Sequence, residues 1–106
     1  MATIQIADNF KNTAIDTVQT VFTASTSAVV IESFTAANNS AVNASYKAYI
    51  LSPTSTQPQV PFQIVVWGEI DLGIGVTNQV IPLGSTLKVE SSALDSIYFT
   101  ITGREV

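Results

Sequence analysis

The two residues whose spacing best suits chemistry are Glu69 and Asp71, which flank Ile70 in a stretch bounded by Gly68 and Gly75. Two carboxylates this close could ligate Ca²⁺ or share acid–base work. A hard cation needs about six oxygen ligands, however, and this stretch offers only two charged side chains. We therefore interpret it as a solvated hairpin, and we predict no metal, no cofactor and no catalytic residue.

Histidine and cysteine, which do much of the chemistry near neutral pH, do not occur in the 106 residues. Serine is abundant, but a serine triad needs an imidazole, and neither Lys47 nor Lys88 lies in a motif that replaces it. Glu90 and Asp95 bracket another turn, where we expect Asp95 to bond its own backbone. Gly73-Ile74-Gly75 lacks the lysine and the following helix of a phosphate-binding loop, and is typical of a turn. We predict that the chain is not an enzyme.

The aromatic residues offer a different chemistry, because a platform of rings can bind a sugar. Trp67 ends an apolar run, and it could form such a platform with Tyr46, Tyr49 and Tyr98. Alternatively, Trp67 anchors a β-sandwich core, as one indole does in many small β domains. We favour the core position for Trp67, and we keep a carbohydrate or cell-surface binding module as an alternative function.

Charge and hydropathy narrow the range of partners. Four basic residues are scattered along the chain and outnumbered by eight acidic ones, so we expect no nucleic-acid partner. Only 11% of residues are charged, against about a quarter in an average domain, so other copies or partners are expected to cover part of the surface. The N-terminal residues show no export signal and no apolar stretch approaches about 18 residues, which predicts a soluble, cytoplasmically made protein without a membrane partner, unless a leader was removed before residue 1.

The β-branched content predicts strands, since 23 residues are valine or isoleucine and 24 are serine or threonine. The last run is the clearest, because Ile97, Phe99 and Ile101 fall on one face and the residues between them are polar or tyrosine. Eight runs show strand-like composition: Thr3 to Ile6, Thr17 to Thr23, Val29 to Ala36, Val42 to Leu51, Phe62 to Trp67, Val76 to Ile81, Thr86 to Glu90 and Ile97 to Thr102.

This pattern predicts an all-β protein, a single-domain antiparallel β-sandwich of about eight strands that is jelly-roll-like or immunoglobulin-like. Residues 1–12 are expected to form an N-terminal arm, and residues 13–106 the sandwich domain. The segment from Ser52 to Pro61 holds three prolines in ten residues and is expected to be the longest loop. Asn38-Asn39-Ser40 predicts a turn, because its side chains can bond their own backbone.

Three segments form a recognisable series: Phe22-Thr23-Ala24, the run from Val29 to the asparagine turn at Ser40, and Ile81-Pro82-Leu83-Gly84 before the last strands. On these segments the stretch from Thr20 to Val106 resembles small virion proteins of tailed bacteriophages. In that group the first turn is usually proline–alanine–glycine, where this chain has Ser25-Thr26-Ser27.

The resemblance implies a structural protein without catalytic residues, which assembles on a phage particle and decorates or cements the capsid by bridging neighbouring subunits. The implied partner is the major capsid protein or another virion protein, and the implied location is the virion. We expect a homodimer or homotrimer, with residues 1–13 as the arm that reaches a neighbour. A tail, head–tail junction or fibre-associated role stays open beside the capsid.

Overall fold

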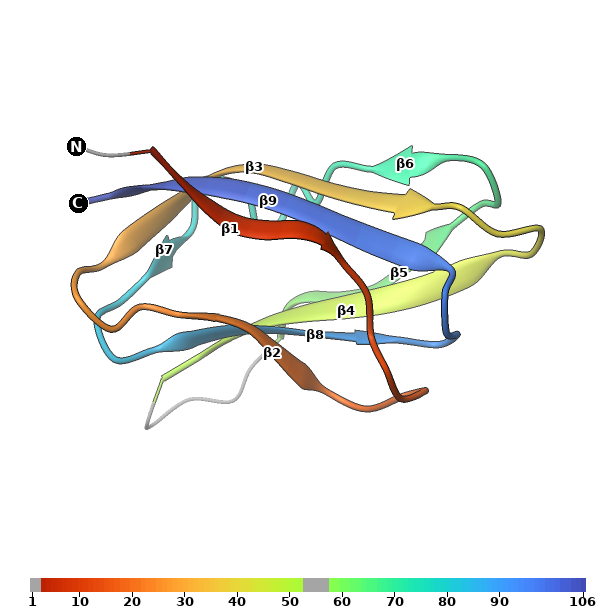
Figure 1. Ribbon diagram of the computed structural model, residues 1–106, viewed down its shortest axis with the longest axis horizontal. Coiled ribbons are helices and arrows are strands. Elements are labelled where there is room, and N and C mark those ends of the chain that lie inside the picture. The colour runs from red at the N-terminus through yellow and green to blue at the C-terminus, as the bar shows by residue number, and fades with distance from the viewer. Residues whose placement is uncertain (1–2, 53–57) are drawn as a thin grey trace.

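Two antiparallel sheets pack face to face in the computed structural model, which describes residues 3–52 and 58–106 and has no helix in these ranges (Figure 1). The first sheet has the order β1-β9-β3-β6, with β7 also paired to β3, and the second has the order β2-β8-β4-β5. The strands are β1 (Thr3–Phe10), β2 (Gln19–Thr23), β3 (Val29–Asn38), β4 (Ala44–Leu51), β5 (Pro58–Val65), β6 (Ile70–Asp71), β7 (Val80–Ile81), β8 (Thr86–Ser91) and β9 (Ile97–Glu105). The predicted single-domain β-sandwich is confirmed.

The connectivity is that of a jelly roll. Strands β6 and β7 both pair with the outer side of β3, so together they act as one interrupted strand. Counted this way, successive strands alternate between the two sheets except at the β4–β5 hairpin. In an immunoglobulin-like sandwich the first strand pairs with the second, whereas here β1 pairs with β9, the last. Both lateral edges are therefore defined: β1 and β2 on one side, β5, β6 and β7 on the other.

The predicted strands overlap eight of the nine observed ones, and β6 is the strand that the sequence did not predict. In β9 the residues Ile97, Phe99 and Ile101 are buried and the residues between them are partly exposed, as their alternation predicts. Strand β6 has only two residues, too few for alternation to be visible.

In place of the expected arm, Thr3–Phe10 form the edge strand β1 of the five-stranded sheet. Ile6 and Ala7 are buried in the core, and the register of β1 against β9 shifts between Gln5 and Ala7 and again before Phe10. The strand-like composition of Thr3 to Ile6 was recognised, but its pairing with β9 was not, because the two shifts interrupt the alternation through which a longer strand would be recognised.

The loop expected from Ser52 to Pro61 overlaps the start of strand β5. Residues 53–57 lie outside the described residues, and Pro58 already begins β5. Strand β5 pairs on one side with β4 and is the last strand of its sheet. Prolines are tolerated there because an edge strand has one side on which no ladder hydrogen bond is required.

Three aromatic rings from both sheets fill the middle of the core. Phe34 and Phe99 come from the five-stranded sheet and Tyr46 from the four-stranded sheet, with ring centroids 5.4 to 5.9 Å apart in each pair. Such pairs add about 0.5–1.5 kcal/mol each beyond burial alone. Tyr46 therefore holds the central aromatic position that the sequence analysis gave to Trp67.

The hydroxyl of Tyr46 donates a hydrogen bond to a carboxylate oxygen of Asp71 in β6, so this pair joins the two sheets. The second bond to that oxygen comes from the backbone N–H of Gly73, at 3.0 Å. Burial, and after it the bond to Asp71, raises the pKa of Tyr46 well above its usual range. The neutral phenol is thus strongly favoured in the folded protein.

We expect the free energy of unfolding to fall once the pH exceeds about 10. Above that pH the tyrosine ionises in the unfolded chain but stays neutral in the folded one, so stability is lost by up to about 1.4 kcal/mol per pH unit. Urea unfolding at about pH 8 and about pH 11, followed by circular dichroism, measures this loss. The loss should be smaller in Tyr46→Phe, and equal losses in the two proteins would contradict the assignment.

Asn38 ties the end of β3 to three other segments. Its buried side-chain amide donates to the carbonyl oxygens of Val42 at 2.9 Å and Val65 at 2.8 Å, and its side-chain oxygen accepts from the backbone and hydroxyl of Ser40. Its backbone bonds Gly68 and Glu69, both at 2.9 Å. The predicted asparagine turn is confirmed, and it also fixes where the chain leaves β5 and enters β6.

Candidate functional site

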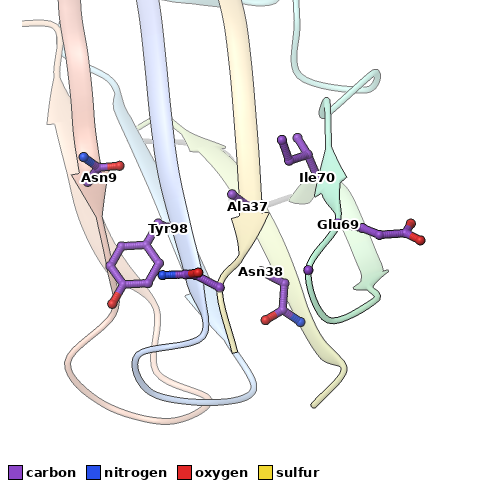
Figure 2. Close-up of a pocket in the computed structure, with 8 residues that line it drawn as sticks. Asn9, Ala37, Asn38, Glu69, Ile70 and Tyr98 are labelled. Carbon is purple, nitrogen blue, oxygen red and sulfur yellow. The ribbon is translucent and has the colours of Figure 1, made fainter. Parts of the chain in front are cut away.

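The carboxylates of Glu69 and Asp71 do not converge. Asp71 faces the core and is bonded to Tyr46 and to the backbone of Gly73. Glu69 is exposed, and Figure 2 shows its carboxylate directed away from Tyr98. Among the described residues, no group of three or more acidic side chains could hold a metal ion. The arrangement does not bring the two carboxylates together for Ca²⁺ or for acid–base work.

The remaining candidate acids each have a local partner. Glu90 accepts a hydrogen bond from the Tyr49 hydroxyl at 2.5 Å, and burial together with this bond raises the pKa of Tyr49 to about 12. Asp95 pairs with Lys11 at 2.6 Å across the surface, a contact that raises the pKa of Lys11. The expectation that Asp95 bonds its own backbone is replaced by this ion pair. These are surface contacts between strands and loops.

Trp67 is not in the core, so the position predicted for it is wrong: 60% of its surface is exposed. Strand β5 ends at the buried Val65, and Trp67 lies beyond it in the turn toward β6, where its backbone N–H bonds Asn43 at 3.1 Å. The tyrosines do not gather around it. Tyr46 is buried in the core, and Tyr49 and Tyr98 lie on strands of different sheets. The four-ring platform, kept as the alternative in the sequence analysis, is not assembled.

An apolar strip occupies one lateral edge of the sandwich. We define it by six exposed side chains within the stretch that leaves β5, turns and passes through β6 into the following loop. They are Ile64, Val66, Trp67, Ile70, Leu72 and Ile74. Ile74 is 92% exposed, and the others lie between 41% and 64%. Seven other large apolar side chains are exposed elsewhere in the described part of the chain, but the six of the strip lie within eleven consecutive residues, and such a concentration marks an interaction site more often than bare solvent contact.

On the opposite lateral edge, the exposed side chains of the two edge strands are polar. Strands β1 and β2 expose Thr3, Gln5, Asp8, Asn9, Thr20 and Thr23, and none of the exposed large apolar side chains belongs to either strand. The loop between β1 and β2 does expose Ile15 and Val18, so this edge carries two large apolar side chains against the six of the strip. The asymmetry supports a directional role for the strip.

A groove of about 550 Å³ adjoins the strip on the five-stranded sheet. It is lined by residues of four strands and two turns, and Figure 2 shows Asn9, Tyr98, Ala37 and Ile70 arranged across it. Ile70 belongs both to the groove and to the strip. The volume of the groove falls in the range of ordinary small-ligand sites, about 300–1,000 Å³.

Comparison of the chain with family models, with curated proteins and with solved structures finds no match. Function must therefore be argued from the strip and the groove themselves. No helix in the described part of the chain is long and apolar enough to cross a bilayer.

Sequence reasoning missed the strip, although a signal for it was present. Ile70, Leu72 and Ile74 alternate with Asp71, Gly73 and Gly75, a pattern of a strand with one apolar face. Such alternation usually means that the apolar face is buried. Here the opposite holds, because Asp71 and Gly73 face inward and the three apolar side chains face outward. The groove left no comparable signal, since its residues come from distant parts of the sequence.

Proposed function

We propose that this chain is a non-enzymatic structural protein of a bacteriophage virion, which decorates the capsid by bridging neighbouring subunits. The observation that carries the proposal is the apolar strip, which gives a small low-charge jelly roll one lateral edge suited to stable docking. The resemblance of Thr20 to Val106 to small virion proteins supplies the biological setting. Jelly rolls occur in viral shells, which agrees with the proposal by analogy of fold alone.

The six side chains of the strip extend around the edge, from the outer face of the four-stranded sheet at Ile64 to the outer face of the five-stranded sheet at Ile70. From the exposed fractions of these side chains, the strip presents on the order of 700 Å² to solvent, against about 800 Å² per partner in a standard interface. It contains the chain's single tryptophan, and tryptophan is enriched among the residues that dominate binding energy. Burial of the strip against a shell protein would thus provide the whole mechanism, without chemistry.

The strip takes over the contact role that the sequence analysis gave to an arm. Because Thr3–Phe10 are held in the five-stranded sheet, the reaching element is the β5–β6 edge. We keep the major capsid protein as the proposed partner, the virion as the location, and a homodimer or homotrimer as the proposed state on the particle. Attachment at the tail, the head–tail junction or a fibre is the alternative within the virion.

The proposal predicts that Leu72→Asp with Ile74→Asp lowers binding to capsids by about 100-fold or more, since charges placed in a desolvated apolar contact cannot be compensated. Both residues are exposed, so circular dichroism and the melting temperature should not change. The assay is cosedimentation with phage particles depleted of this chain, with Trp67 fluorescence as a second readout.

The matched control is Thr20→Asp with Thr23→Asp on the opposite edge, which adds the same charge away from the strip. The control should bind like the unmodified protein. Unchanged binding of the strip variant would contradict the proposal, and so would equal losses in both variants. Immunogold labelling of bound particles then separates the shell from the tail.

A further inference from the structure

Beyond assembly, we propose that the groove on the outer face of the five-stranded sheet binds a neutral saccharide. The site is built mainly from β1, β3, β9 and the turn into β6, and it differs from the aromatic platform that the sequence analysis considered as an alternative (Figure 2). Binding is tested on the free chain, so the experiment does not depend on whether the strip docks on a capsid, although docking would cover Ile70, which is one wall of the groove.

The pairing of three strands shapes the groove. Ala37 in β3 is directly opposite Tyr98 in β9 and directly opposite Ile70 in β6. Directly opposed residues point to the same face of a sheet, so a small residue lies between two large ones. With strands roughly 4.8 Å apart, the two walls stand roughly 10 Å from each other. This leaves a trough whose floor is a methyl group and whose walls are a phenol ring and an aliphatic side chain.

The polar groups around the trough are free to bind a ligand. The Tyr98 hydroxyl and the side-chain amide of Asn39 form no hydrogen bond with any described residue, and both residues line the groove. Asn9 makes only long side-chain contacts, at 3.4 Å to Asp8 and 3.5 Å to Thr100. These groups can both donate and accept, as sugar hydroxyls require.

The backbone of Asn9 adds an independent observation. Asn9 has a φ of 53°, in the left-handed region, at the point where the register of β1 against β9 shifts. Such bulges redirect a side chain out of the regular alternation, and they are enriched next to functional sites. Figure 2 shows the result, with the Asn9 amide beside Tyr98 at one wall of the groove.

Charge argues against an anionic ligand. Glu69 lies at the rim, Asp8 is next to Asn9, and the chain has a net charge of −4. The one nearby cation, Lys11, lies 5.9 Å from the Tyr98 ring centroid and is held by Asp95 at 2.6 Å. A phosphate or sulfate would therefore find no free cation among the lining residues.

A sugar ring fits both the apolar walls of the groove and the uncharged polar groups at its rim. One face of a pyranose is apolar and can lie on the Tyr98 ring or against Ile70, while its hydroxyls reach the amides and the phenol at the rim. An aromatic or aliphatic wall with a few well-placed polar groups is the usual composition of small-ligand sites. The ligand class that the geometry selects is thus a neutral mono- to trisaccharide unit.

The test is NMR titration of the ¹⁵N-labelled full chain with maltotriose, cellotriose, chitotriose and mannotriose, and with an anionic heparin disaccharide. We expect one or more neutral trisaccharides to shift the amide signals of Ala37, Ile70 and Tyr98 with a dissociation constant of about 1 mM or tighter. We expect the heparin disaccharide to shift none of them. No groove shift with any neutral trisaccharide, or shifts with the anion only, would overturn the proposal.

Three variants locate the binding. Tyr98→Ala removes one wall and Ala37→Leu fills the floor, and each should weaken the binding by tenfold or more. Tyr49→Ala is the matched control, because Tyr49 is a partly exposed tyrosine on the other sheet. The affinity of the Tyr49→Ala variant for the saccharide should equal that of the unmodified protein. Binding that survives both groove variants, or that falls equally in the control, would place the saccharide elsewhere and overturn the site.

Discussion

Replacing Gly73 by alanine is expected to lower the free energy of unfolding by about 3 kcal/mol, a drop of more than about 10 °C in melting temperature for a domain of this size. Gly73 has a φ of 58°, which costs an alanine about 1–2 kcal/mol. A Cβ at this position would also lie 2.3 Å from Cδ1 of Phe34, whose ring is packed between Tyr46 and Phe99 and cannot retreat.

The matched control is Gly68→Ala. Gly68 also has a positive φ, of 74°, but an added Cβ would meet nothing within 4 Å. This variant should lose only the backbone part, about 1 kcal/mol. Urea denaturation of both variants separates conformational strain from the clash with Phe34. Equal losses at the two positions would show that the ring is free to move and that the core around it is loosely packed.

Asn38→Ala is expected to lower the free energy of unfolding by about 3 kcal/mol or more, a loss similar to that expected for Gly73→Ala. The change removes both donors to the carbonyl oxygens of Val42 and Val65 and the acceptor for Ser40. A buried polar group left without a partner costs about 1–3 kcal/mol. Thermal and urea unfolding measure the loss.

The neighbour Asn39 provides the comparison for this prediction, because it is exposed. Asn39→Ala should change the free energy of unfolding by less than about 0.5 kcal/mol. In Asn38→Ala, hydrogen exchange should also become faster at the backbone amides of Gly68 and residue 38, which donate to the carbonyls of residue 38 and Glu69, respectively, and depend on the same turn. A stability loss without faster exchange there would mean that the turn does not hold the β5–β6 connection.

Much of the fold was predictable because long strands show their buried face directly. Leu87 and Val89 in β8, and Ile97, Phe99 and Ile101 in β9, are fully buried as their alternation indicates. The choice between a jelly roll and an immunoglobulin-like sandwich was not predictable. It depends on which strands pair, and pairing of β1 with β9 joins residues about a hundred positions apart without any local signal.

The candidate sites were harder to predict, because each depends on which way a side chain turns. Trp67 was expected inside because it ends an apolar run, yet β5 stops two residues earlier and the inner position goes to Tyr46. Asp71 was expected at the surface as half of a carboxylate pair, yet it turns inward to the Tyr46 hydroxyl. A single apolar or charged residue near a strand end has no fixed face until the sheet register is known.

The pairing of β1 with β9 and of β2 with β8 also affects when these strands can fold during synthesis. Neither β1 nor β2 has its native neighbour until β8 and β9 have left the ribosome. Contacts so distant in sequence fold slowly, and unpaired strands are prone to aggregate in the meantime. The nascent chain thus carries the apolar faces of β1 and β2 without their native partners while the strands between are synthesised. Its yield in cells should depend more on elongation rate and chaperone supply than its final stability would suggest.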